Sequence, residues 1–429
     1  MISQMVATMS NKVIVIGAGA AGTMAAGTAS ENGADVLLLE RNDKIGRKVM
    51  ITGKGRCNVT NDIGDDVQKF ISNIPGNGRF LYGAYSAFNS QDVMYFFEDY
   101  GVSLKVERGN RVFPESDKAV DIVDALNSYI TEMGVKRKQE RVTTLITEDN
   151  CVKGVITDMG NEYYADSVII ATGGLSYPKT GSTGDGYKLA ESVGHTITTL
   201  RPSLSALKCY EGICSECMGL SLKNVSIKVF DTKKKKEIYE DFGEMLFTHF
   251  GVSGPMILSA SAHMRDMEKE RYEIYIDLKP ALSHEKLDAR ILRDFADNTN
   301  KSISNVLSLL LPKSLISPVL RLAHIKQSEK INQVTKEMRK NLVDTIKSLK
   351  LTVTDFNDIN EAIVTSGGVK VSEINPKTME SKICKGLYFA GEVIDCDGYT
   401  GGFNLQIAFS TGHLAGISAS NNRGELKND

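Results

Sequence analysis

Three glycines near the start of the chain have the spacing Gly17-x-Gly19-x-x-Gly22. They lie between an apolar, β-branched run at residues 13–16 and an alanine-rich segment, and a second apolar run ends at Glu40. A strand, a glycine turn, a helix and an acid-ended strand in this order form the dinucleotide-binding fingerprint. The glycines let a diphosphate approach the helix N-terminus, and the acid accepts from a ribose hydroxyl. The motif predicts a bound nucleotide, and by itself it fits FAD and NAD equally.

A basic loop follows this fingerprint. Residues 46–56 contain three glycines and four lysines or arginines without apolar periodicity. Such a loop can lie along a diphosphate and wrap a flavin, and the alternative is a solvated loop without a ligand. Cys57 has no second cysteine at the spacing of a flavin disulfide reductase. We therefore expect it to be a small residue packed near the cofactor and not a redox thiol.

Two later segments end in similar motifs. The apolar strand predicted at residues 167–170 runs into Ala171-Thr172-Gly173, and the one at 386–390 runs into Gly391-Glu392. A carboxylate in that position suits a ribityl hydroxyl. An alanine- and glycine-rich helix begins near Gly402. Its positive end would stabilise an anionic reduced flavin by about 0.3–2 kcal/mol. The end of the chain therefore returns to the first domain.

The elements that position these motifs divide the chain into segments of different composition. Alternating strands and helices over residues 1–200 and 371–429 predict a discontinuous α/β domain with a Rossmann-like sheet. Short β-type segments over 201–280 and 351–370 predict an inserted β-barrel-like domain. Amphipathic runs over 281–350 predict a small helical insert without catalytic motifs.

Several local features are also predictable. Periodicity favours one helix over 78–100, a two-stranded hairpin over 141–165 and a strand over 203–207. Residues 233–236 are four consecutive lysines between two predicted strands, which indicates a solvated hairpin tip. Cys214-x-x-Cys217 lies close to Cys209, but no second pair provides further metal ligands, so a surface loop is expected there.

Composition limits the class of protein. The 429 residues carry 51 basic and 53 acidic side chains, and this balance predicts neither nucleic acid nor a membrane surface as a partner. Seven scattered cysteines fit a reducing compartment, and no apolar run approaches the length of a membrane span. We expect a cytoplasmic protein with a small-molecule substrate and no bound metal.

With these motifs in place, the chain resembles the BaiN-like family of NAD(P)/FAD-dependent oxidoreductases, which includes aminoacetone-oxidase-like flavoproteins. The similarity covers nearly the whole chain and includes the strings 46–48, 53–61, 111–114, 171–178, 180–186, 246–249, 378–382 and 391–406. It implies a two-dinucleotide-type FAD-binding domain, an inserted barrel and a helical insert, with FAD at the first motif. One branch of the family reduces conjugated C=C bonds of 3-oxo bile acids, and another oxidises aminoacetone.

The motifs and the resemblance together predict one FAD site formed by both ends of the chain. The predicted cofactor-binding residues are Gly17, Gly19, Ala20, Ala21, Gly22, Glu40, Arg41, Arg47, Lys48, Gly53, Gly55, Arg56, Cys57, Asn58, Ala171, Thr172, Gly173, Gly391, Glu392, Asp395, Gly401, Gly402, Phe403, Asn404 and Leu405. Enone reduction also needs a proton donor. Tyr399, His249 and Tyr177 are candidates by chemistry and motif position.

Three functions follow from this site. The leading hypothesis is a reductase in which NAD(P)H visits transiently, passes a hydride to FAD, and FAD passes it to a conjugated enone such as a bile acid or steroid. The first alternative is an FAD-dependent amine oxidase with oxygen as acceptor. The second is a flavoprotein that associates with RNA, which the balanced charge disfavours.

Overall fold

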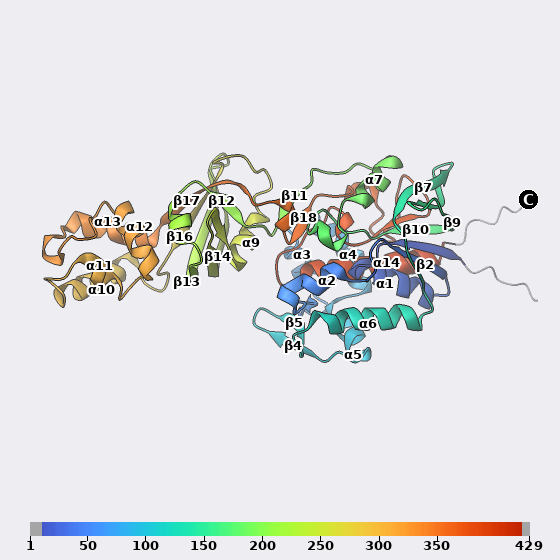
Figure 1. Cartoon of the computed structure of the whole chain (residues 1–429), viewed down its shortest axis with the longest axis horizontal. Helices are drawn as coiled ribbons and strands as arrows, with labels where there is room; N and C mark the ends of the chain where they lie inside the picture. The colour runs from blue at the N-terminus through green and yellow to red at the C-terminus, as the bar shows by residue number, and fades with distance from the viewer. Residues whose placement is uncertain (1–10, 423–429) are drawn as a thin grey trace, which may run out of the picture. The chain divides into compact units, whose positions relative to one another are not determined.

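The computed structural model describes residues 11–422, and the chain divides into two compact units. The first contains the residues up to Ser203 and those from Ile359 onward, and the second is Leu204–Asp358. Five parallel strands form the main sheet of the first unit in the order β19-β10-β1-β2-β6. Their bounds are Leu387–Phe389, Ser167–Ile170, Lys12–Ile16, Asp35–Glu40 and Lys136–Gln139. Strands β10 and β2 of this sheet are labelled in Figure 1. Strand β19, near the C-terminus, thus pairs with β10 from the N-terminal half of the chain. This parallel sheet confirms the predicted α/β class.

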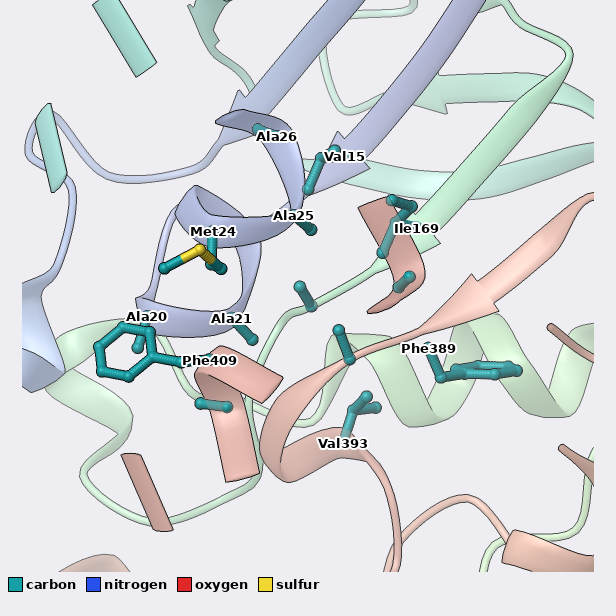
Figure 2. Packing of buried hydrophobic residues seen from close by; sticks show 14 of the residues in the cluster. Val15, Ala20, Ala21, Met24, Ala25, Ala26, Ile169, Phe389, Val393 and Phe409 are labelled. Atoms are coloured by element: carbon teal, nitrogen blue, oxygen red, sulfur yellow. The ribbon is translucent and has the colours of Figure 1, made fainter. Parts of the chain in front are cut away.

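Two helices rich in small residues pack closely against each other in this unit. They are α1 (Ala20–Glu31) and α14 (Phe403–Ser420). A Cβ atom added at Gly412 of α14 would lie 2.4 Å from the backbone oxygen of Ala21, and one at Gly416 would lie 2.6 Å from that of Ala25. Figure 2 shows Phe409 of α14 beside α1 in the same apolar cluster. Only glycine allows this approach, so the composition of α14 reflects helix packing.

The predicted helix over 78–100 is interrupted. It consists of a 3₁₀ turn, Gly78–Leu81, and two helices, α4 (Tyr82–Ala87) and α5 (Ser90–Asp99). Asn89 separates the two helices because its side chain caps α5 and Asp92 accepts the backbone N–H of Asn89. A polar capping box therefore overrides the apolar periodicity.

The first unit also contains smaller sheets and four further helices. The expected hairpin is a three-stranded sheet of β7 (Val142–Glu148), β8 (Cys151–Thr157) and β9 (Glu162–Tyr164). A second small sheet contains β3 (Thr60–Asn61), β5 (Arg111–Pro114) and β4 (Leu104–Glu107). The other helices are α2 (Arg47–Ile51), α3 (Val67–Ser72), α6 (Ala119–Glu132) and α7 (Asp185–Ser192).

The second unit contains a closed barrel with the strand order β12-β15-β14-β13-β16-β17. The bounds are Leu207–Cys209, Gly251–Ser253, Lys236–Phe247, Ser221–Asp231, Tyr272–Asp277 and Leu349–Phe356. The barrel-like prediction is confirmed; three of the four lysines lie in the exposed β13–β14 turn, and Lys236 begins β14. Short helices α8 (Ile213–Glu216) and α9 (Pro255–Ser261) accompany the strands. Cys214 and Cys217 are buried there and not in a surface loop, since a thiol packs as a small apolar group.

Helices α10 (His284–Ala296), α11 (Ile303–Leu307), α12 (Lys313–Leu322) and α13 (Lys336–Lys347) complete the second unit. Leu287 and Ile291 of α10 belong to the same buried cluster as Ile274 and Leu351 of the barrel. The helical segment, predicted as a separate insert, thus shares one core with the barrel. The structure groups these two segments as one unit.

The boundaries of the units also differ from the predicted ones. Residues 359–370 belong to the first unit, whereas the prediction placed 351–370 in the barrel. Strand β18 (Val364–Ser366) pairs with β11 (Arg201–Ser203), which is also in the first unit. A single strand was expected over residues 203–207. The structure instead has β11, which ends at Ser203, and β12, which begins at Leu207. Within the described residues, no helix combines the length and apolar character that crossing a bilayer requires.

A buried histidine makes the first unit sensitive to acid. Nδ1 of His195 lies 3.2 Å from Glu373, Nε2 lies 2.7 Å from Ser381 Oγ, and burial lowers the pKa of the ring more than Glu373 raises it. A lowered folded-state pKa means that protonation favours the unfolded chain. We expect stability to fall as the pH drops below about 6.5, the ordinary histidine value. Thermal unfolding between pH 7.5 and 5.5 should show a shallower decline for His195→Gln; an unchanged slope would contradict this role.

Candidate cofactor-binding site

A cavity opens in the first unit at the carboxyl edge of the parallel sheet. Ile16 ends β1, Glu40 ends β2, Ala171 follows β10 and Ala390 follows β19, and all four line it. About 1320 Å³ of space lies within it, part of which is open to solvent. In open α/β sheets this edge is where ligands bind, because the helix N-termini converge there.

The three glycines of the fingerprint have different tasks. Gly17 has a φ of +98°, and a Cβ there would lie 2.7 Å from the backbone oxygen of Ala171. A Cβ at Gly22 would lie 1.8 Å from the oxygen of Gly17, so this glycine allows α1 to pack against the turn. At Gly19, by contrast, no atom lies within 4 Å of an added Cβ, although the residue lines the cavity. The open space in front of Gly19 is a backbone cradle at the N-terminus of α1.

Glu40 holds the turn in place from the adjacent strand. Its Oε2 accepts from the N–H of Ala18 at 2.7 Å, and Oε1 accepts from the backbone and side-chain N–H groups of Asn42 at 2.8 and 2.7 Å. Asn42 in turn accepts from Arg47 Nη1 at 2.8 Å. The predicted acid is therefore fixed beside the glycine turn, with lone pairs left for a ribose hydroxyl.

Two arginines meet one carboxylate on another part of the wall. Arg141 donates to Asp185 through Nε and Nη2 at 2.8 and 2.7 Å, and Arg41 Nη1 donates to Asp185 at 3.2 Å and to Thr183 at 2.6 Å. Burial raises the pKa of Asp185, but Arg141 and Arg41 outweigh it and the net shift is downward. Only Arg41 of this group is a predicted site residue. The prediction included neither Arg141, which lies outside the motifs, nor Asp185, which lies in the family string 180–186 but was not assigned to the cofactor.

A second polar cluster surrounds Glu392. Lys48 Nζ donates to Glu392 Oε2 at 2.6 Å and to Ser176 Oγ at 2.7 Å. The other oxygen, Glu392 Oε1, accepts from the N–H of Thr365 at 2.8 Å and from Ser176 Oγ at 3.1 Å. Lys48 and Glu392 both line the cavity.

The cavity wall includes many of the predicted cofactor residues. They are Gly17, Gly19, Ala20, Ala21, Glu40, Arg41, Arg47, Lys48, Ala171, Thr172, Gly173, Gly391, Glu392, Asn404 and Leu405. The wall also contains residues that were not predicted, among them Glu140, Arg141, Thr180, Ser182, Asp185 and Cys396. The predicted residues outside this wall are Gly22, Gly53, Gly55, Arg56, Cys57, Asn58, Asp395, Gly401, Gly402 and Phe403.

Several of these residues outside the wall have structural partners. Arg56 donates to Glu107 at 2.5 Å and to Asp117 at 2.6 Å, and its guanidinium lies 4.2 Å from the Phe113 ring centroid. Its charge therefore anchors a loop. Cys57 is fully buried, and burial raises the pKa of its thiol to about 12, so it is not a thiolate near neutral pH.

The start of α14 is supported by strand β3. Asn61 donates to the backbone oxygen of Gly401 at 2.9 Å, and a Cβ at Gly402 would lie 2.3 Å from the backbone oxygen of Thr60. This support places the first turn of α14, with Asn404 and Leu405, on the cavity wall. The positive end of an 18-residue helix thus faces the cavity.

The three candidate proton donors do not line this cavity. Tyr177 has a φ of +52° at a turn, and Tyr399 donates its backbone N–H to Asn73. His249 is exposed in the second unit and contacts the ring of Phe250. Their catalytic roles remain predictions.

The chemistry of the wall fits FAD. Two helix N-termini and the Gly19 cradle suit a diphosphate and an electron-rich flavin edge. Thr172 also lines the cavity, but its Oγ1 is buried against Gly186, where an added Cβ would lie 2.1 Å from it. Backbone amides and carboxylates on the wall together match the diphosphate and polyhydroxyl parts of the cofactor.

Comparisons with known proteins agree with this assignment. A family model described as "HI0933-like protein Rossmann domain" matches residues 11–418. The "3-dehydro-bile acid delta(4,6)-reductase" of Clostridium scindens is 32% identical over 422 residues, which cover 96% of this chain and 99% of that protein. A "Ribosomal RNA dihydrouridine synthase" of Haemophilus influenzae is 31% identical over 410 residues, covering 95% and 98%.

A solved structure shares the fold. The 3-ketosteroid-delta4-(5alpha)-dehydrogenase from Rhodococcus jostii RHA1, in complex with 4-androstene-3,17-dione, aligns with a TM-score of 0.53. The alignment covers 97% of this chain and 99% of that chain at 17% sequence identity.

Proposed function

The chain belongs to the HI0933-like Rossmann family and is an FAD-dependent oxidoreductase, and we propose that it passes a hydride from NAD(P)H to a small conjugated enone. Membership confirms the resemblance identified in the sequence. The observation that carries the proposal is the glycine-cradled cavity together with a relative, similar over nearly its whole length, that is named as a reductase of a 3-dehydro-bile acid.

The proposed acceptor is defined by its chemistry. A C=C bond conjugated to a carbonyl accepts a hydride at its β-carbon and a proton at its α-carbon. When bound, FAD supplies the two-electron hydride transfer, while the protein supplies orientation, charge and exclusion of water. Gly19 and the start of α14 are the proposed contacts to the two ends of the cofactor. NAD(P)H is proposed to visit the flavin transiently, and Tyr399, Tyr177 and His249 remain the proposed proton donors.

Anaerobic mixing tests the donor and the acceptor separately. NADH or NADPH is expected to bleach the flavin absorbance of the holoprotein, and a 3-oxo-Δ4 steroid added afterwards should restore it with formation of the saturated ketone. A saturated 3-oxo steroid is the matched control and should not restore the absorbance. A flavin that neither nucleotide bleaches would exclude the NAD(P)H-linked reductase. Bleaching by aminoacetone alone, followed by peroxide formation with oxygen, would favour the amine oxidase.

A second candidate acceptor is a uracil base in RNA. Two ribosomal RNA dihydrouridine synthases match 95% and 93% of this chain at 31% and 29% identity. Their named product, dihydrouridine, is uridine with its C5=C6 double bond reduced, and in uridine this double bond is conjugated to a ring carbonyl. The two candidates therefore share one reaction class. Adding a uridine-containing ribosomal RNA fragment to the anaerobically reduced protein distinguishes them, because reoxidation of the flavin with formation of dihydrouridine would identify RNA as the acceptor.

A further inference from the structure

One ion pair on the cavity wall is held in place from several directions. Glu392 Oε1 accepts from the backbone N–H of Thr365 at 2.8 Å, which does not depend on Lys48. A Cβ at Gly174 would lie 2.9 Å from the same oxygen, so the backbone packs closely against the carboxylate. Glu392 therefore has fixed support that remains when its cationic partner is removed.

Lys48 still has bonding capacity directed to a ligand. An ammonium group has three N–H donors. In the described part of the chain two of them go to Glu392 and Ser176, and the side chain, 24% exposed, lies on the cavity wall. Its third donor and its charge are thus available to a molecule inside the cavity. Glu392, 20% exposed, presents the opposite charge to the same space.

We propose that Lys48 and Glu392 act as an opposed pair that sets the reduction potential of bound FAD. Two-electron reduction gives an anionic flavin, and a nearby charge on the wall of a partly enclosed cavity interacts with it more strongly than in bulk water. Lys48 therefore favours the reduced cofactor and Glu392 favours the oxidised one. The near-neutral pair keeps the potential between the values that either charge alone would give. This inference rests on FAD binding but not on the proposed donor or acceptor.

Single substitutions should move the potential in opposite directions. Lys48→Met leaves the anchored carboxylate and is expected to weaken the binding of reduced FAD relative to oxidised FAD about tenfold. For a two-electron couple this corresponds to a reduction potential about 30 mV more negative. Glu392→Gln leaves the cation and should shift the potential by a similar amount in the positive direction. The double variant should return close to the wild-type value. Lys48→Arg, which keeps the charge, should shift it much less than Lys48→Met.

A reductive titration with xanthine oxidase and a reference dye measures these potentials without NAD(P)H or substrate. Dissociation constants for oxidised and reduced FAD give the same ratio if affinity falls too far for the titration. Lys54→Met is the matched control, since Lys54 is exposed and does not line the cavity. Equal loss of affinity for both redox forms, or shifts of the same sign in the two single variants, would overturn the proposal. A flavin that NAD(P)H fails to bleach would instead contradict only the proposed function.

Discussion

A Gly19→Leu variant is expected to fold but to purify without FAD. Gly19 has a φ of −83°, which any L-residue adopts, and no atom lies within 4 Å of an added Cβ. The larger side chain therefore costs the protein little, but it fills the cradle at the N-terminus of α1. We expect FAD affinity to fall by about 100-fold or more, which corresponds to about 2.8 kcal/mol. Flavin absorbance after gel filtration and FAD titration of the apoprotein measure the loss.

Two other glycines provide controls for this variant. Gly33, just after α1, has a φ of +88°, and Gly33→Asn should retain FAD because asparagine tolerates the left-handed region. Gly22→Ala should instead destabilise the protein itself, since its Cβ would overlap the oxygen of Gly17 at 1.8 Å. Gly19→Leu with normal FAD binding and an unchanged melting temperature would exclude this turn as the cofactor cradle.

The sequence predicts the cradle well because its physical requirements are local. A tight turn, a close helix start and an acid-ended strand must occur within about 25 residues, as the fingerprint describes. The Arg141–Asp185 pair is different. Arg141 precedes β7 and Asp185 begins α7, and only the fold brings them to one wall. Because the two residues are far apart in the sequence, their ion pair produces no short, fixed spacing that a sequence motif could describe.

A dense run of motif residues also does not distinguish residues that contact the cofactor from residues that support the backbone around it. Residues 53–61 read as one cofactor loop, yet Arg56 is held by Glu107 and Asp117, and Asn61 supports the backbone at Gly401. Both kinds of role demand specific residues at specific places, so both produce conspicuous sequence strings. Arg56 and Asn61 therefore support the backbone around the wall, and direct contacts of this segment with the cofactor stay a prediction.

The interior of the second unit shows a further limit of sequence periodicity. Amphipathic spacing correctly predicts helices at 281–350, but periodicity describes one face of one element and does not identify its partner. Leu287 and Ile291 pack in the same cluster as the barrel residue Ile274. A shared core is a long-range property, and it makes one compact unit of two segments with different local patterns.

A large effect on stability is also expected at the contact between α1 and α14. Replacing Gly412 by alanine would raise intrinsic helix propensity by about 1 kcal/mol. The added Cβ, however, would lie 2.4 Å from the backbone oxygen of Ala21, an atom that cannot move without shifting α1. Overpacking of this kind costs about 1–3 kcal/mol or more. We therefore expect Gly412→Ala to lower the melting temperature, and Gly412→Leu to lower it further with loss of FAD.

Ser418→Ala separates helix propensity from packing, because Ser418 lies on the same helix but is only partly buried. The melting temperature of this variant should equal that of the wild type or be slightly higher, as helix propensity alone predicts. A rise of the same size in Gly412→Ala would show that α14 can move away from α1 at little cost. The expected fall would instead mean that the backbone contact fixes both helices, and with them the two N-termini that face the cofactor cavity.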